Sequence, residues 1–307
     1  MRLSYTFFFF FLLVKIGFSQ NERLYTMFVF NKLQYNPAYA GAKDALNIGV
    51  HYRHQWQGVE GAPKTISAFA HTPFGDGRSG LGLTLTSDEI GILNTTIGSV
   101  DYAYRIQFKN KHRLSVGLNL QLDNASFNWS KANLLDNSDK NIPLDAATQT
   151  TMNIGVGVYY SSAEEFYVGI SAPGIMRNAI TSNSYHGFSR YNEFRPYYLM
   201  GGLILKAGDN ILLRPSFLIS YIANAPFEVD VNLSVLLMEK FWIGANYRLQ
   251  ESIDAYVQFP ITEQLKLAVG YDYPVTKLNQ FTSGSGEIML EYIFNKGTER
   301  VNNIRYF

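Results

Sequence analysis

The sequence predicts an all-β fold, a single closed transmembrane antiparallel β-barrel of about 14 strands. Three observations predict it: apolar and polar residues alternate along many segments, aromatic residues are abundant, and the lengths of the connections follow a regular order. The chain has 307 residues, which is long for one ordinary soluble domain but normal for one closed barrel.

Alternation is clearest between residues 114 and 123, where Leu114, Val116, Leu118, Leu120 and Leu122 are separated by small or polar residues. Such a period of two indicates a strand with one apolar and one polar face, which in a barrel face lipid and lumen respectively. Segments of about ten residues are long enough to cross a bilayer as tilted strands. The pattern predicts strands near residues 45–56, 64–73, 79–87, 96–108, 113–125, 150–161, 166–172, 196–206, 211–222, 227–238, 241–250, 253–261, 264–273 and 286–294.

Composition agrees with a membrane barrel and excludes several other classes of protein. Tyrosine and phenylalanine number 21 and 22, more than a core needs, and they suit aromatic girdles at two membrane interfaces. The mean hydropathy of −0.08 does not indicate a helical membrane protein. The net charge of +1 argues against a nucleic-acid surface, and the lack of cysteine excludes disulfides and thiolate sites.

The connections between predicted strands differ in length by position. Those at 109–112, 162–165, 207–210, 239–240 and 262–263 are short and polar, whereas the opposite set includes 126–149, 173–195 and 274–285. Barrels of this type have short periplasmic turns and longer external loops, so we expect the long loops to face outward. Pro215 lies within the ninth strand, where it removes one ladder donor and suggests a bulge.

The sequence divides the chain into three regions. Residues 1–19 read as a signal peptide, with Arg2 before an apolar run and the small Gly17 and Ser19 before a cleavage point at Gln20. The competing interpretation, a membrane anchor, needs a run of roughly 20 apolar residues, and this run is shorter. Residues 20–44 lack alternation and contain turn signals, so we expect a lead-in segment in the periplasm or in the barrel mouth. Residues 45–307 form the barrel.

Catalytic and metal-binding signatures are weak. His51 and His54 lie three residues apart, which on a strand places them on opposite faces, and no histidine has metal-ligand spacing. His71 with a nearby serine could imitate a hydrolase site, but no nucleophile, base and orienting group can be picked out. We therefore expect no catalytic residue, no metal and no cofactor.

Charged residues on the predicted polar faces have mixed signs. They are Arg53, Asp101, Arg105, Asp123, Arg214, Asp230, Arg248, Asp254, Lys266, Asp272, Glu287 and Glu291. The simpler interpretation is a wet lumen crossed by ion pairs. The alternative is a selectivity lining or a docking surface for a peptide, although mixed signs argue against a strongly ion-selective pore.

The segment RHQWQGVEGAPKT, residues 53–65, is the most unusual stretch. We expect Arg53 to point inward, Trp56 to lie at the lipid headgroup level, and Pro63 to fix the re-entry into the next strand. Gly58 and Gly61 permit backbone shapes closed to other residues. The segment is either a tight first loop with a girdle tryptophan or a recognition loop, and its candidate partner-binding residues are Arg53, Trp56, Gly58, Gly61 and Pro63.

Four motifs together resemble the PorP/SprF family: YNPAYAG at 35–41, RHQWQGVEGAPKT at 53–65, HTPFG at 71–75 and the terminal Arg305-Tyr306-Phe307. The resemblance implies an outer-membrane protein of Bacteroidota that works in type IX secretion and gliding. It implies as partners the C-terminal domains of large secreted adhesins, of the type B class, and an OmpA-like peptidoglycan-binding periplasmic protein. It supplies no catalytic residues.

The sequence and the resemblance together predict a non-enzymatic barrel of the Gram-negative outer membrane that supports secretion or surface attachment of such adhesins. It would contact outer-membrane lipid and no nucleic acid. The alternative function is a passive or substrate-specific porin that uses the charged lumen. A membrane-embedded hydrolase is a third class, without support from any motif.

Overall fold

The structure is a computed structural model, and it describes residues 25–109, 111–129, 147–162, 165–176, 179–181, 190–192, 195–208, 210–223 and 225–294. The predicted signal peptide and the terminal Arg305-Tyr306-Phe307 lie outside the described residues. Among the described residues, no helix is both long and apolar enough to cross a membrane.

The strands follow the alternating segments closely. The first half of the wall comprises β1 (Asn47–His54), β2 (Lys64–Phe74), β3 (Ser79–Ile90), β4 (Leu93–Gln107), β5 (His112–Phe127), β6 (Ala147–Ser162) and β7 (Phe166–Ala172). The second half comprises β10 (Tyr197–Leu203), β11 (Leu205–Gly208), β12 (Ile211–Tyr221), β13 (Glu228–Leu237), β14 (Phe241–Arg248), β15 (Ser252–Pro260), β16 (Leu265–Pro274) and β17 (Ser285–Ile293). The short β8 (Ala179–Thr181) and β9 (Arg190–Asn192) pair only with each other.

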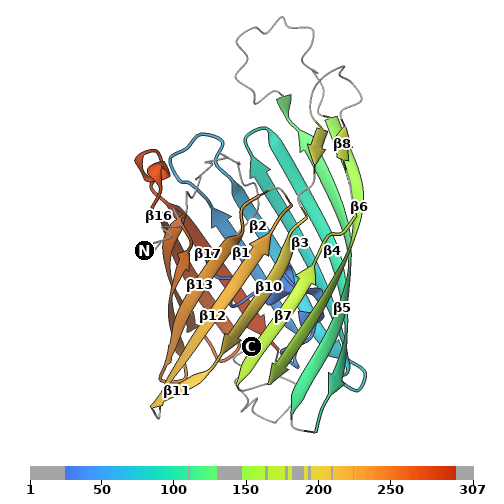
Figure 1. The fold of residues 1–307 in the computed structure, drawn as a ribbon, viewed down its shortest axis with the longest axis vertical. Coiled ribbons are helices and arrows are strands. Elements are labelled where there is room, and N and C mark those ends of the chain that lie inside the picture. Colours follow the sequence, from blue (N-terminus) through green and yellow to red (C-terminus); the bar gives the residue numbers. More distant parts are fainter. Residues whose placement is uncertain are drawn as a thin grey trace, which may run out of the picture.

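The wall closes on itself as an antiparallel barrel (Figure 1). β1 pairs with both β2 and β17, and β10 pairs with both β7 and β12, so no strand of the wall is left with an open edge. β10 and the first half of β11, as far as Lys206, pair with β12 in one common register, so β10 and β11 are two pieces of one strand. The predicted closed barrel of 14 strands is therefore confirmed. Closure is required because a strand edge in lipid would leave backbone groups without hydrogen bonds.

The faces of the strands agree with the predicted alternation. On β5, Leu118 is 55% exposed on the outer surface, whereas Asn119 beside it is 6% exposed and points inward. The same alternation runs along β1, where Ile48, Val50 and Tyr52 are exposed. Apolar side chains therefore face lipid, and polar side chains line the interior.

Pro215 does not produce the bulge expected within its own strand. β12 pairs with β13 without any shift in register, and Pro215 lies opposite Leu233. The interruption falls instead in the neighbouring strand, between β10 and β11, where the register with β12 places Leu203 and Ile204 opposite Pro215 and Arg214. Proline has no backbone N–H, so the ladder breaks on the side where that donor is missing.

Connections at one end of the barrel are all short: residues 75–78, 108–111, 163–165, 209–210, 238–240 and 261–264. The opposite end carries the longest connections, 128–146 and 173–196, and also the loops 55–63 and 275–284. Two short turns, 91–92 and 249–251, also lie at that end. The long-loop end is the one that faces outward in barrels of this type.

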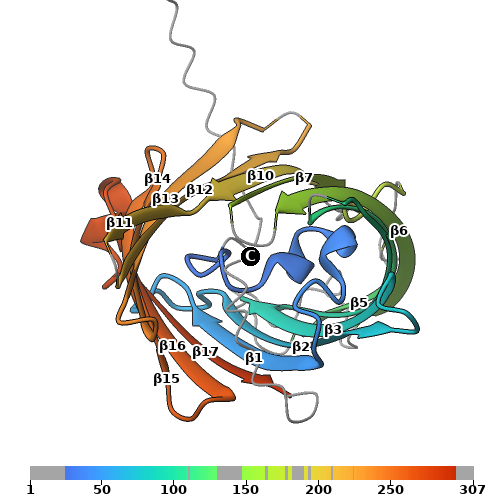
Figure 2. The ribbon, with the colours of Figure 1, turned by 90° about the horizontal axis from the view of Figure 1, so that it is seen from below.

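Residues 25–44 lie inside the barrel, surrounded by the strands (Figure 2). They contain two short 3-10 helices, η1 (Lys32–Gln34) and η2 (Pro37–Tyr39), and almost all of their side chains are buried. We name residues 25–44 the lumenal plug. This is the described part of the lead-in segment that the sequence places in the periplasm or in the barrel mouth, and it lies in the interior of the barrel.

Candidate functional site

The candidate site is the lumenal plug together with the inner wall that holds it. Its middle part, residues 36–40, rests on glycines that point inward from β3, β5, β6 and β7. A Cβ atom on Gly117 or Gly80 would overlap the plug backbone at Ala38 or Ala40, and one on Gly157 would overlap the side chain of Asn36. The wall therefore needs glycine at these positions for the plug to pack against it.

Asn36 fixes the centre of the plug. Its side-chain oxygen accepts a hydrogen bond from Ala38 N at 2.9 Å, which caps η2. Its amide nitrogen donates to the carbonyl of Val158 on β6 at 3.0 Å. Ser171 on β7 donates from its hydroxyl to the carbonyl of Tyr35 at 2.6 Å. These bonds satisfy buried polar groups that would otherwise be costly to remove from water.

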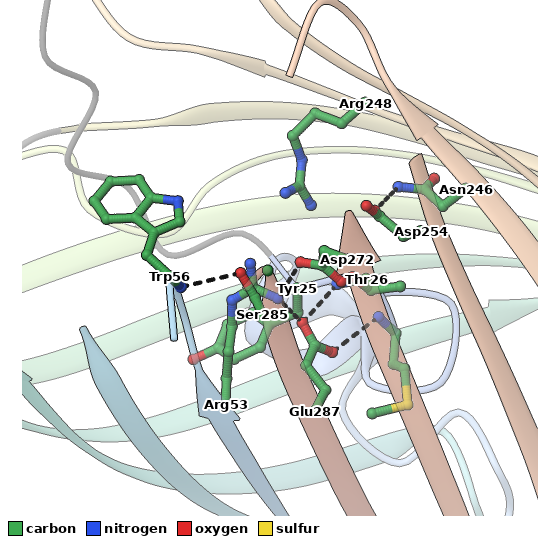
Figure 3. A network of polar contacts seen from close by, with 12 residues as sticks. Tyr25, Thr26, Arg53, Trp56, Asn246, Arg248, Asp254, Asp272, Ser285 and Glu287 are labelled. Carbon is green, nitrogen blue, oxygen red and sulfur yellow. Dashed lines mark hydrogen bonds and ion pairs between the residues drawn. The ribbon is translucent and has the colours of Figure 1, made fainter. Parts of the chain in front are cut away.

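The first residues of the plug bind a cluster of charged groups near the long-loop end (Figure 3). Glu287 on β17 accepts a hydrogen bond from Thr26 N at 2.9 Å, and the Thr26 hydroxyl donates to Asp272 on β16. Arg53 on β1 forms ion pairs with both Asp272 and Glu287. His51 lies 3.1 Å from Glu287 and packs against the ring of Tyr25.

The last residues of the plug are held near the short-turn end. Arg105 on β4 donates to the carbonyl of Gly41 at 2.5 Å, and Arg105 and Arg113 both pair with Asp44. Lys43 pairs with Glu291 on β17. The plug is thus bound to the wall at both ends as well as at its centre.

Lys32 places a cation in the middle of the plug. Its ammonium lies 4.8 Å from the ring centre of Tyr167 and 5.4 Å from that of Tyr39, and it donates to the carbonyl of Val29 at 2.8 Å. Aromatic faces stabilise a cation that has lost its water.

Several of the inward charges form ion pairs with each other and with the plug. Arg248 lies 3.0 Å from Asp230, and Asn246 donates hydrogen bonds to Asp230 and to Asp254. Figure 3 shows the bond between Asn246 and Asp254. On the other side of the barrel, Asn119 donates to Asp101 at 2.7 Å. Of the twelve predicted inward charges, all except the half-buried Lys266 are buried.

The five candidate partner-binding residues divide between the lumen and the loop after β1. Arg53 is buried in the charged cluster described above. Gly58 and Gly61 have φ angles of +98° and +71°, which favour glycine, and the Pro63 carbonyl accepts from Gln55 N at 2.9 Å. Gln57 exchanges backbone hydrogen bonds with Gly284 and Ser283, both at 2.7 Å, so loops 55–63 and 275–284 are joined.

Trp56 departs from the strand pattern that the sequence suggested. β1 ends at His54, and Trp56 has a left-handed backbone with φ of +48°. Its backbone N donates to the Ser285 hydroxyl at 3.2 Å (Figure 3). Alternation along β1 therefore does not extend to Trp56.

Nothing in the described part of the chain points to catalysis. His71, the candidate for a hydrolase base, accepts a hydrogen bond from Gly41 N at 3.1 Å and packs against Tyr39, so it holds the plug. Among the described residues, no three histidine or acidic side chains are placed to hold a metal ion.

Sequence reasoning missed the plug as a site. Alternation cannot identify a segment that has no regular period, and the contacts that hold this segment lie far away in the sequence. One signal was present: glycines stand at inward positions on neighbouring strands, at Gly80, Gly82, Gly117, Gly157 and Gly169. Inward positions without side chains leave space in the lumen, which indicates that another segment fills it.

The barrel is similar in fold to several outer-membrane proteins of known structure. The toluene transporter TbuX of Ralstonia pickettii matches at 10% identity and a TM-score of 0.50, over 86% of this chain and 93% of that one. A FadL homologue of Pseudomonas aeruginosa matches at 13% identity and 0.49, over 87% and 94%. Omp33 of Acinetobacter baumannii matches at 9% and 0.48, over 81% and 98%.

A comparison with curated proteins finds no match. The model of one protein family, "Type IX secretion system membrane protein PorP/SprF", matches residues 17–292 and so covers most of the chain. The match includes the lumenal plug, the loop 55–63 and every strand of the wall up to β17. The chain is an outer-membrane β-barrel that belongs to the PorP/SprF family of type IX secretion system membrane proteins.

Proposed function

We propose that this protein is a non-enzymatic docking component of type IX secretion, which holds a secreted adhesin at the cell surface by its type B C-terminal domain. The observation that carries the proposal is the filled lumen. The plug brings Tyr25, Phe28, Tyr35 and Tyr39 into the barrel, and these are among the largest fully buried side chains of the described residues. A barrel whose lumen is filled is suited to bind partners on its loops and turns, and not to conduct solutes.

The same observation weighs against the porin alternative. Side chains of the wall fill a barrel of about 8 strands, and porins of 16 to 18 strands leave an aqueous channel. This wall of 14 strands lies between those sizes, and the plug occupies its interior. Here the plug is tied to the wall by the ion pairs and hydrogen bonds of Thr26, Gly41, Lys43 and Asp44. Moving it would expose these buried charged groups.

The long-loop end offers the docking surface. Hydrogen bonds join the loops 55–63 and 275–284, and Gly91 N donates to the Gly61 carbonyl at 2.9 Å, which ties the β3–β4 turn to them. Phe281 is 70% exposed at the end of η4 (Lys277–Gln280), on the same pair of loops. Preorganised loops lose little entropy on binding, and exposed aromatic side chains are frequent binding hot spots.

The short-turn end would meet the periplasmic machinery. Membership of the family implies other secretion components as neighbours. We place the OmpA-like peptidoglycan-binding protein at this end, because its six short connections form the face opposite the long loops.

The test replaces the two loop glycines. Gly58→Val with Gly61→Val forces side chains onto φ angles of +98° and +71°, so the loop must change shape while the strands remain. We expect normal amounts of the double variant in the outer membrane, with most of the adhesin released into the medium. Immunoblots of the membrane fraction and of adhesin in cells and medium measure both quantities.

A matched control is available in the turn between β2 and β3. Gly75 and Gly77 also have positive φ angles, +64° and +81°, and a Cβ on either meets nothing within 4 Å. Gly75→Val with Gly77→Val strains a turn at the other end of the barrel, and we expect it to leave the adhesin on the cells. Adhesin retained equally by both double variants would exclude a docking role for the loop 55–63.

A further inference from the structure

The outer surface of β1–β5 contains a groove of about 510 Å³, within the range of roughly 300–1,000 Å³ that holds small molecules. Its walls are the exposed aliphatic side chains of Leu83, Leu85, Val100 and Leu120. These residues face away from the lumen, so the groove opens toward the membrane and is distinct from the plug site.

Small residues form the floor of the groove. In the cross-strand register, Ala68 lies between Val50 and Leu85, and Ala70 lies between Ile48 and Leu83. Gly98 lies between Leu85 and Leu122. The groove is therefore a depression in the outer surface, and branched aliphatic side chains surround it.

Gly98 is not required by packing within the protein. A Cβ atom at this position would meet nothing within 4 Å, and the φ angle of Gly98 is not positive. Glycine in a strand interior weakens the strand, and it often marks a place where another molecule approaches closely. The structural effect of Gly98 is to leave the groove open.

The groove ends at a row of polar residues on the side of the long loops. Ser87, Thr96 and Asn124 face outward in one cross-strand row, one step beyond the row of Leu85, Gly98 and Leu122. Outward polar side chains indicate the level of lipid headgroups, since the lipid-facing band between the interfaces is apolar. A molecule in the groove would therefore have its polar end at this row and its apolar part below it.

We propose that this groove is a binding site for one acyl chain of an outer-leaflet lipid. The barrel lies in the outer membrane, so lipid is the medium that this face meets. The aliphatic walls match a hydrocarbon chain, and the row of Ser87, Thr96 and Asn124 can hydrogen-bond a headgroup or its ester oxygens. The proposal is independent of the docking function.

Photo-crosslinking of the full barrel in proteoliposomes tests the proposal. The vesicles contain phosphatidylethanolamine and phosphatidylglycerol, with a small fraction of phosphatidylcholine that carries a diazirine midway along one acyl chain. Mass spectrometry compares lipid adducts at Leu83 and Leu120 with adducts at Val231 and Ile253, which are similarly exposed elsewhere on the wall. We expect severalfold more adduct at the groove, and equal labelling at the two places would overturn the proposal.

Filling the groove supplies the matched variants. Ala70→Leu with Gly98→Leu should lower the adducts at Leu83 and Leu120 to the level of the rest of the wall. Ala255→Leu, at another exposed alanine on β15, should leave them unchanged. Heat-modifiable migration on gels shows whether each variant folds.

One further variant tests the occupant itself. A photoreactive residue in place of Val100 in cells should crosslink to lipid, and crosslinking to a protein would overturn the lipid assignment.

Discussion

At the scale of single residues, the direction of each side chain decides what that residue contributes. Leu118 and Asn119 are neighbours on β5, yet one faces lipid and the other donates a hydrogen bond to Asp101 inside the barrel. Each inward side chain, in contrast, bonds to particular polar groups inside the barrel. Arg53, for example, pairs with two carboxylates that also bind the plug.

Because the two side chains face lipid and lumen, the same substitution should lower the free energy of unfolding by different amounts at the two positions. Leu118→Arg should destabilise the folded barrel by roughly 2–4 kcal/mol, the cost of a cation near the bilayer midplane. Asn119→Arg should cost less, because the new guanidinium would lie beside Asp101. Refolding into lipid vesicles across a urea series measures both free energies, and equal values would contradict the assignment of the two faces.

Local alternation sets the direction of a side chain along a regular strand, and it sets no direction where the backbone leaves the strand. The inward direction of Arg53 followed from its position on β1, since a period of two holds along a regular strand. The lipid-interface position expected for Trp56 depended on extending that alternation two residues further. The left-handed φ of Trp56 ends the alternation there, and alternation alone cannot signal where it stops.

At the scale of elements, the plug is the part of the fold that strand patterns could not predict. The strands of the wall are local, because the alternation that identifies each of them lies within the strand itself. The plug depends instead on glycines as far apart as Gly80 and Gly169. Pro215 shows the same limit, because its missing donor was recognised but the resulting break lies in the neighbouring strand.

The fit between plug and wall predicts the effect of a single wall substitution. Gly117→Val places a side chain where Ala38 lies, and overpacking of this kind costs about 1–3 kcal/mol. We expect amide hydrogen exchange of residues 25–44 to accelerate roughly five- to 150-fold, as that free energy corresponds to. Mass spectrometry of the plug peptides measures this rate.

Gly98→Val on the adjacent strand is the control, since a Cβ at Gly98 meets nothing within 4 Å. Its plug should exchange at the wild-type rate. Unchanged exchange in Gly117→Val would show that the wall glycines do not support the plug.

At the scale of the whole molecule, the buried charges are sorted along the barrel axis. Near the long loops, carboxylates outnumber cations: Asp88, Asp123, Glu228, Asp230, Asp254, Asp272 and Glu287 lie there together with Arg53 and Arg248. Near the short turns, cations outnumber acids among Lys43, Arg105, Arg113, Arg214, Lys266 and Glu291. The plug connects these two halves, and pairs with Asp272 and Glu287 at one end and Arg105 and Glu291 at the other.

The central claim, that the lumenal plug closes the barrel, is tested most directly by conductance in planar lipid bilayers. The wild-type protein should insert without opening a steady channel. A variant in which Gly117→Val and Gly157→Val displace the plug should give stepwise openings with a linear current–voltage relation. A wild-type protein that opens a steady channel, with the same conductance as that double variant, would contradict the claim and favour the porin function.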